Sequence, residues 1–165
     1  MSTTIRPATP SDGPGIAAVQ LATWQANYQQ WLPEVVAALD LARTADNWSR
    51  AAGVADQRVA VAVHGDRIVG YAHSGPPEDE DDDADHELYA LYVLPEVQGG
   101  GIGGRLFADA VAATSSGSSG GWLVWALEQY QPARRFYERQ GFQLDPLRTR
   151  LWRGLTEVRY QTPNQ

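Results

Sequence analysis

The chain has 165 residues, of which 43% are hydrophobic and 20% charged, and this fits a single globular domain over residues 1–165. No apolar run reaches the ~18 residues that a transmembrane helix requires. Residues 1–10 lack a signal-peptide pattern, so we expect a cytoplasmic protein with no membrane partner. The absence of cysteine excludes disulfide bonds, thiolate metal sites and a cysteine nucleophile.

The net charge of −7 arises in one segment of the chain. Eight acidic residues lie from Glu78 to Glu87, and the rest of the sequence carries 12 acids against 13 bases. All 13 bases are arginine, which excludes a lysine Schiff base and the lysine of a P-loop. Because no basic patch with interleaved aromatic residues occurs, we expect no nucleic-acid partner.

The N-terminal third of the chain predicts one strand followed by helices. Residues 3–6 favour a short strand. Ser11 and Asp12 are typical N-cap residues of a helix, with Pro14 in its first turn. Apolar spacing continues this helix through Trp24. Two shorter helical segments are predicted at residues 34–39 and 47–52.

The apolar pattern then changes to period two, which indicates β-structure. Arg58–His64 and Arg67–Ser74, joined by a two-residue turn, predict a β-hairpin. The next strand, Glu87–Leu94, is apolar on both faces and is therefore predicted to lie in the middle of a sheet. The acidic loop, residues 76–87, joins the hairpin to this strand.

The remaining residues alternate between helices and strands, which is typical of a mixed α/β domain. Gly141 follows one of these helices as a C-terminal cap residue. The predicted order is a helix from Ile102, a flexible connector at 115–121, a strand at 122–127, a helix at 133–140, and strands at 142–144 and 151–160.

Five glycines occur among the six residues 99–104, between the predicted central strand and the next helix. Glycines let backbone N–H groups approach a ligand, and a helix N-terminus favours an anion, so the loop indicates phosphate or pyrophosphate binding. A plain turn that caps an amphipathic helix is the alternative. The loop also matches the dinucleotide-binding pattern G-x-G-x-x-G, with Glu128 as the later acid. Against that match, Pro95–Gln98 separate the strand from the first glycine.

Three motifs in this half of the chain resemble the GNAT superfamily of acetyl-CoA-dependent N-acetyltransferases. Gln98–Gly103 is similar to the pyrophosphate loop Q/R-x-x-G-x-G/A, Leu91–Pro95 to the strand L-x-V-x-P, and Ala133–Phe142 to the helix A-x-x-F-Y-x-x-x-G-F. Ile5–Asp12 also resembles the family's first strand and helix. The resemblance implies a GNAT fold of the α/β (α+β) class. It has a central mixed, mostly antiparallel sheet of about six to seven strands, about four flanking helices, and a splayed parallel strand pair that holds CoA.

By this resemblance the chain uses acetyl-CoA as its cosubstrate and needs no metal. The backbone of Leu91 and Val93 would pair with the pantetheine arm, and an N–H near Val93 would stabilise the tetrahedral oxyanion. The three histidines, His64, His73 and His86, show no paired metal-ligand spacing. The implied cofactor-binding residues are Leu91, Tyr92, Val93, Gln98, Gly99, Gly100, Gly101, Ile102, Gly103 and Gly104.

Two side chains are candidates for proton transfer. Tyr137 matches the family tyrosine that often protonates the departing thiolate, and a core aromatic is the alternative. Glu87 is the candidate base for the attacking amine, since protein-modifying members of the family often keep a glutamate here. Its alternative is a solvated member of the acidic run, and Glu128 is a weaker candidate base. Tyr130 departs from the asparagine that the family often has at that position.

The expected acceptor is a primary amine, either of a small polycation or of a peptide N-terminus. Tyr28 and Trp31 are predicted to line the amine pocket together with Glu87, because aromatic faces attract cations. The acidic loop would concentrate cationic amines, or else is only a solvated charge run. The strand at 151–160 is a candidate homodimer contact. A CoA-binding sensor without turnover, a dinucleotide-binding oxidoreductase and a transferase of longer acyl chains remain as alternatives.

Overall fold

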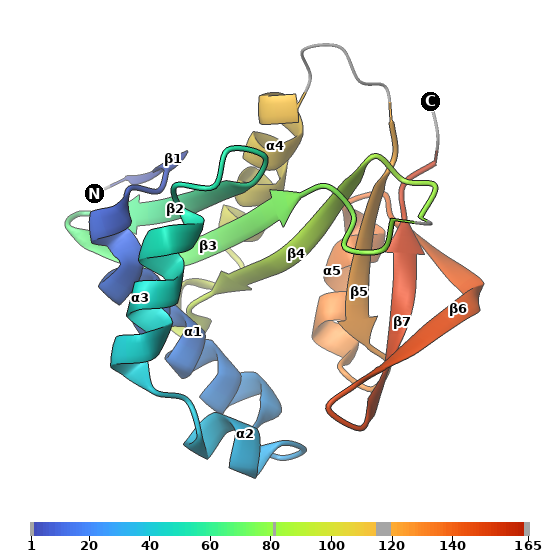
Figure 1. The fold of residues 1–165 in the computed structure, drawn as a ribbon, viewed down its shortest axis with the longest axis horizontal. Helices are drawn as coiled ribbons and strands as arrows, with labels where there is room; N and C mark the ends of the chain where they lie inside the picture. The colour runs from blue at the N-terminus through green and yellow to red at the C-terminus, as the bar shows by residue number, and fades with distance from the viewer. Residues whose placement is uncertain (1, 81, 115–119, 164–165) are drawn as a thin grey trace. The chain divides into compact units, whose positions relative to one another are not determined.

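The computed structural model of the chain describes residues 2–80, 82–114 and 120–163. Within these ranges it has seven strands and five α-helices (Figure 1). The strands are hydrogen-bonded in the order β1-β2-β3-β4-β5-β7-β6, with β4 and β5 parallel, which confirms the mixed sheet and the central place of β4. Residues 115–119 of the predicted connector and Asp81 of the acidic loop lie outside the described residues.

The predicted strands of the hairpin, the strand at 122–127 and the helix from Ile102 are confirmed within one residue at each predicted end. The elements are β1 (Thr3–Pro7), α1 (Gly13–Tyr28), α2 (Pro33–Ala37), α3 (Leu41–Ala51), β2 (Arg58–His64), β3 (Arg67–Gly75), β4 (His86–Val93), α4 (Ile102–Thr114), β5 (Trp122–Leu127), α5 (Gln131–Arg139), β6 (Gln143–Trp152) and β7 (Leu155–Gln161), with short 3-10 turns at Pro10–Asp12 and Pro95–Val97.

The chain forms two compact units, the first from Met1–Ser74 and Ala90–Ala113, the second from Gly75–Tyr89 and Thr114–Gln165. The boundary falls inside β4, so this strand contributes residues to both units. The first unit contains β1 to β3 with α1 to α4, and the second contains β5 to β7 with α5.

In the first unit, helices cover both faces of the strands β1 to β3 (Figure 1). Gly70 and Tyr71 are neighbours on β3, so these positions face opposite sides of the sheet. The Tyr71 ring packs against Trp48 of α3, with 4.9 Å between ring centroids. A Cβ atom at position 70 would lie 3.4 Å from Cδ1 of Leu106 in α4. The α3 side and the α4 side therefore form two separate core layers.

An ion pair fixes the start of α1. The Asp12 carboxylate accepts hydrogen bonds from the Thr9 backbone N–H at 2.7 Å and from Nη1 of Arg6 at 2.8 Å. The hydrogen bond from Arg6 lowers the pKa of Asp12 to about 2. α1 continues to Tyr28 rather than ending near Trp24, because the residues between them include no glycine or proline.

The helix predicted at 47–52 begins earlier than expected. α3 starts at Leu41 because Asp40 is its N-cap, with a carboxylate that accepts a hydrogen bond from the Arg43 backbone N–H at 2.9 Å. Asp40 is a typical N-cap residue and could have indicated this start, which the apolar pattern alone did not show. α2, predicted at 34–39, spans Pro33–Ala37.

The prediction for the two final strands was wrong in its boundaries. The segment 151–160 is divided by a tight turn at Arg153 and Gly154, whose φ angles are 49° and 82°, and it supplies the end of β6 and most of β7. β6 begins at Gln143 and continues past Pro146, with a register shift between Asp145 and Thr149. Proline argues against a central strand, but β6 lies at the sheet edge, where a bulge accommodates it.

In the second unit, the two faces of the sheet differ in chemistry. Val158 and Tyr160 of β7 are buried on one face, and Tyr160 packs against Tyr137 of α5 with 6.5 Å between ring centroids. The alternate residues of β7, Glu157 and Arg159, point to the other face. A helix therefore covers one face of these strands, and the other face carries charge.

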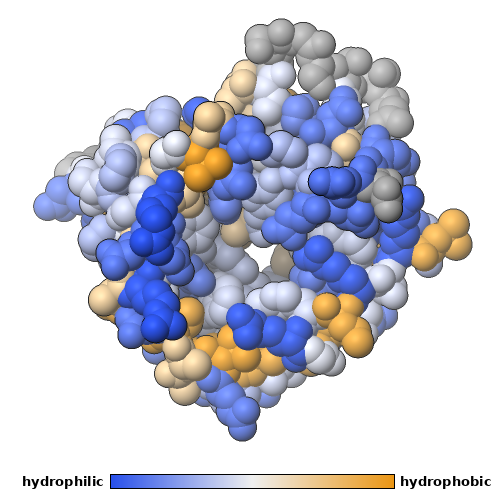
Figure 2. All heavy atoms as spheres, viewed as in Figure 1, coloured by the Kyte–Doolittle hydropathy of each residue, from blue (hydrophilic) through white to orange (hydrophobic). Residues whose placement is uncertain are grey.

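Figure 2 shows small groups of hydrophobic residues scattered over a mostly hydrophilic face of the molecule. The most exposed large hydrophobic residue is Leu147 of β6, at 91%. Over the described part of the chain, no helix is long and apolar enough to cross a membrane.

Candidate active site

The glycine loop in the first unit has a backbone that depends on glycine at two positions. Gly99 and Gly101 have φ angles of 85° and 80°, in the left-handed region that other residues adopt only with strain. No heavy atom outside their chain neighbours lies within 4 Å of a Cβ built at either position. The loop therefore leaves open space directly beside its backbone.

The loop leads into the N-terminus of α4. The helix begins at Ile102, so Gly103 and Gly104 belong to its first turn, and the Arg105 N–H donates to the Gly101 carbonyl at 3.1 Å. The N–H groups of a first turn have no acceptor within their own helix. The helix dipole adds positive potential at this end, so the loop is suited to an anionic group.

The Gln98 side chain ties this loop to β4. Its Nε2 donates to the backbone carbonyl of Val93, the last residue of β4, at 2.9 Å. The 3-10 turn Pro95–Val97 lies between them in the chain. The interrupted path from strand to glycine loop differs from the dinucleotide-binding pattern, in which the first glycine follows its strand directly.

On the α1 side of the first unit, Tyr28 and Tyr92 meet. Their hydroxyl oxygens are 3.0 Å apart, and Trp24 packs edge-on against Tyr28 at 5.6 Å between centroids. Trp31 follows the end of α1, and its N–H donates to the Tyr28 carbonyl at 3.0 Å. The sequence placed Tyr92 among the cofactor-binding residues and assigned no role to its side chain. The alternation of β4 was the signal that its side chain lies opposite that of Val93.

In the second unit, the strand register places the charged residues on one sheet face. Arg159 of β7 lies opposite Trp125 of β5 and Asp145 of β6. Glu157 of β7 lies opposite Arg150 of β6. We call this the charged face. Glu87 of β4 also lies on the charged face. It pairs with Leu123 of β5, and Leu123 pairs with Gln161 of β7, so the three side chains point to the same side of the sheet.

Glu87 is almost fully buried, with 3% of its surface exposed. Its Oε2 accepts a hydrogen bond from the Glu78 backbone N–H at 3.1 Å. Burial raises the pKa of Glu87 from 4.5 to about 7; the hydrogen bond acts in the opposite direction, and the Glu78 carboxylate adds to the rise. A carboxyl group with such a pKa can accept and release a proton near neutral pH.

Arg150 is the basic group that lowers the pKa of Glu87. Its Nε donates to Oε1 of Glu157 at 2.7 Å, and its Nη1 lies 4.0 Å from Oε2 of Glu78. The guanidinium also lies over the Trp125 ring, 4.5 Å from its centroid. A cation thus already sits between an aromatic ring and two carboxylates on the charged face.

Tyr137 lies on the opposite face of the same strands from Glu87. It is 7% exposed and packs against Phe142 and Tyr160, with 5.7 and 6.5 Å between ring centroids. This packing agrees with a core role and leaves the proton-donor hypothesis for Tyr137 to experiment. Tyr130 precedes α5, and burial raises its pKa.

The structure thus gathers the predicted site residues into three groups. The first unit joins the cofactor-binding residues of β4 to the glycine loop and separately brings Tyr28 to Tyr92, whereas the second unit puts Glu87 and Tyr137 on different sheet faces. Glu128 is exposed just after β5. Among the described residues, no three His, Asp or Glu side chains are grouped as a metal site.

Comparison with known proteins assigns the family. The GNAT acetyltransferase domain model matches residues 55–144. A probable N-acetyltransferase of Mycobacterium tuberculosis is 30% identical over 93% of this chain and 87% of its own length. The uncharacterized N-acetyltransferase YuaI of Bacillus subtilis is 30% identical over 82% of this chain and 77% of its own.

A solved structure shows the same fold. The PaiA N-acetyltransferase of Thermoplasma acidophilum, in complex with coenzyme A, aligns with a TM-score of 0.72 and 17% identity, covering 96% of this chain and 98% of its own. The family match sets aside the dinucleotide-binding oxidoreductase, which the turn between β4 and the glycine loop already disfavoured. The chain belongs to the GNAT family of acetyltransferases.

Proposed function

We propose that this chain transfers the acetyl group of acetyl-CoA to a primary amine. The observation that carries the proposal is the glycine loop, where two left-handed glycines leave open space at the N-terminus of the 13-residue helix α4. A diphosphate fits such a site because it needs several N–H donors and a positive helix end.

The cofactor is held mainly by backbone groups. The N–H groups of Gly99–Gly104 bind the pyrophosphate of acetyl-CoA, and the pantetheine arm pairs with the backbone of Leu91 and Val93. The hydrogen bond from Gln98 to the Val93 carbonyl supports this arrangement, since it couples the position of the loop to the end of β4.

The chemistry is a direct attack of the amine on the thioester. The amine nitrogen forms a bond to the carbonyl carbon, Glu87 accepts its proton, and the Val93 N–H stabilises the oxyanion. The carbon–sulfur bond then breaks, the electron pair remains on sulfur, and the Tyr137 hydroxyl protonates this thiolate. Glu87 afterwards releases its proton to water, and Tyr137 regains one from water.

A cationic acceptor fits the second unit best. Glu78 and Asp82 are close enough to raise the pKa of Glu87, so the surroundings of the base are rich in carboxylates. We infer that a small polycation or a peptide N-terminus approaches Glu87, because the carboxylates around this base attract cations.

The test of this function measures the binding of two ligands, acetyl-CoA and NAD, and the turnover of acetyl-CoA with amines. Acetyl-CoA is expected to raise the melting temperature of the protein, and NAD is not. Acetyl-CoA mixed with a panel of diamines, polyamines and short peptides should release free thiol, with a 42-Da mass increase, about one acetyl group, on one panel member. Binding without turnover across the whole panel would instead support a CoA sensor.

Tyr137→Phe is expected to lower kcat by roughly tenfold to hundredfold with little change in CoA affinity, because the thiolate then leaves without a proton donor. Steady-state kinetics and calorimetry measure the two effects. Tyr160→Phe is the matched control: its hydroxyl is bound by Arg134 at 2.9 Å and binds Glu138 at 2.8 Å in the same aromatic cluster. An unchanged kcat in Tyr137→Phe would leave Tyr137 with a packing role only.

A further inference from the structure

We propose that Arg159 is a positioning residue that holds the acidic segment, residues 76–80 and 82–83, against the charged face and over Glu87. The inference deepens the proposed function and rests on it, because it concerns the surroundings of the proposed base. The sequence allowed the acidic loop to be only a solvated run of charges. Asp82 is not solvated in this way, because its side chain is 4% exposed and pairs with Arg159.

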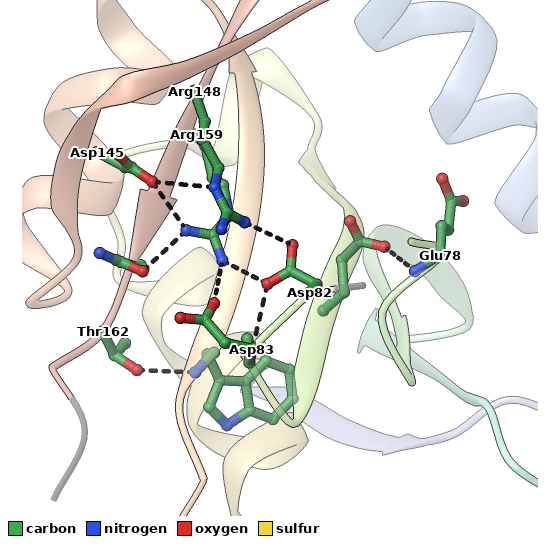
Figure 3. A network of polar contacts seen from close by, with 11 residues as sticks. Glu78, Asp82, Asp83, Asp145, Arg148, Arg159 and Thr162 are labelled. Atoms are coloured by element: carbon green, nitrogen blue, oxygen red, sulfur yellow. Dashed lines mark hydrogen bonds and ion pairs between the residues drawn. The ribbon is translucent and has the colours of Figure 1, made fainter. Parts of the chain in front are cut away.

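Arg159 is the centre of the contacts that hold this segment (Figure 3). It is 1% exposed, and its Nη2 donates to Oδ1 of Asp82 and, at 3.1 Å, to Oδ1 of Asp83. Its Nη1 donates to Asp145 at 3.1 Å and to Gln161 at 2.8 Å. The Arg159 guanidinium therefore ties the segment to both β6 and β7, and Arg148 of β6 adds a longer ion pair to Asp82 at 3.8 Å.

The energetics of this group favour a fixed segment. Removing a guanidinium from water costs several kcal/mol unless carboxylates and hydrogen bonds replace the lost solvation. Burial acts to lower the pKa of Arg159, but the hydrogen bonds and charges of Asp82 and Asp83 together outweigh it, and the pKa lies above its ordinary value. Asp82 and Asp83 supply much of the charge and hydrogen bonding that replace the lost solvation of Arg159, so burial of this cation favours the docked segment.

The same segment also contacts two residues of β4, Tyr89 and Glu87. The Tyr89 hydroxyl donates to the Pro76 carbonyl, and the Glu78 N–H donates to Glu87. Contacts at positions 76, 78, 82 and 83 thus fix the segment along its length. Arg159 makes two of these contacts, so we expect its loss to free the far end of the segment and to weaken the hold on the Glu78 amide.

The direction in which the pKa of Glu87 changes when Arg159 is replaced distinguishes a positioning role from a purely electrostatic one. Glu87 faces Glu78 and Asp82 from the acidic segment and Arg150 from β6, while Glu157 of β7 is paired with Arg150. Burial is the largest cause of its raised pKa, so release of the segment should lower that pKa toward 4.5. Removing a nearby positive charge without any movement would raise it.

The test uses Arg159→Lys, which keeps the charge and loses the two-pronged hydrogen bonding to Asp82 and Asp83. Carboxyl carbon NMR of the protein without substrate should show the pKa of Glu87 falling by about one unit or more. Hydrogen exchange at the Glu78 amide should accelerate about tenfold or more. Asp83→Asn, at a side chain that is 72% exposed, is the milder variant if Arg159→Lys does not fold.

Two controls make the result decisive. Glu80→Gln removes one charge from the same segment at an exposed position and should leave both readings unchanged. Arg150→Met removes a cation beside Glu87 and should raise its pKa. A pKa of Glu87 that rises or stays constant in Arg159→Lys, with the Glu78 amide still protected, would overturn the inference. If this pKa falls but the pH–rate profile does not follow, positioning stands and the role of Glu87 as base fails.

Discussion

Replacing Gly101 with valine is expected to lower the affinity for acetyl-CoA at least about 100-fold. The backbone at this position has a φ of 80°, which costs a β-branched residue roughly 1–3 kcal/mol of strain. The new side chain would also occupy the open space beside the loop, where the pyrophosphate has to approach its N–H donors. The strained loop is expected to relax in the free protein away from the conformation that binds the pyrophosphate, so this relaxation and the exclusion together lower the affinity. Each 1.4 kcal/mol is tenfold in affinity, so a 100-fold loss corresponds to about 3 kcal/mol.

Calorimetric titration with acetyl-CoA measures the effect, and Gly154→Val is the matched control. Gly154 also has a left-handed backbone, with a φ of 82° and open space around its Cβ position, but it lies in the turn between β6 and β7. The control should lose a similar amount of stability and keep its affinity. Retained affinity in Gly101→Val would refute the assignment of the loop to the pyrophosphate.

The glycine loop could be predicted because its signal is local. The strand Leu91–Val93, the turn after Pro95 and the glycines follow one another in the chain, and their geometry depends on nearby backbone. The hairpin of β2 and β3 was equally accessible, since its period-two pattern and its turn are contiguous. Local signals of this kind predicted most of the sheet and the loop that leads into α4.

The surroundings of Glu87 could not be predicted in the same way. Arg159 and Asp82 are 77 residues apart, and no pattern in either segment indicates that they pair. Arg150, the cation beside Glu87, lies on β6, which the sequence did not predict as one continuous strand because it contains Pro146. The sequence placed Glu87 at the start of the central strand, but its burial and its raised pKa come from long-range contacts.

Glu87→Gln is expected to lower kcat by about 100-fold or more, the usual size of a general-base contribution. Glutamine keeps the shape of the side chain and can still accept a hydrogen bond from the Glu78 amide, but it cannot take the amine proton. Activity of the parent protein should fall about tenfold for each pH unit below about 7, as Glu87 becomes protonated. The variant should lose this acid limb and retain only the titration of the amine.

Glu128→Gln, at the weaker candidate base, is the matched control and should keep both the rate and the acid limb.

The pH dependence of protein stability tests the pKa of Glu87 without any substrate. The folded protein holds the proton of Glu87 up to about pH 7, whereas the unfolded chain releases it near 4.5. The unfolded chain therefore binds fewer protons in this interval, and the free energy of unfolding decreases as the pH rises through it. Denaturant unfolding of Glu87→Gln should lack that decrease. A variant that retains the decrease and the acid limb would show that another group titrates, and Glu87 would then not be the base.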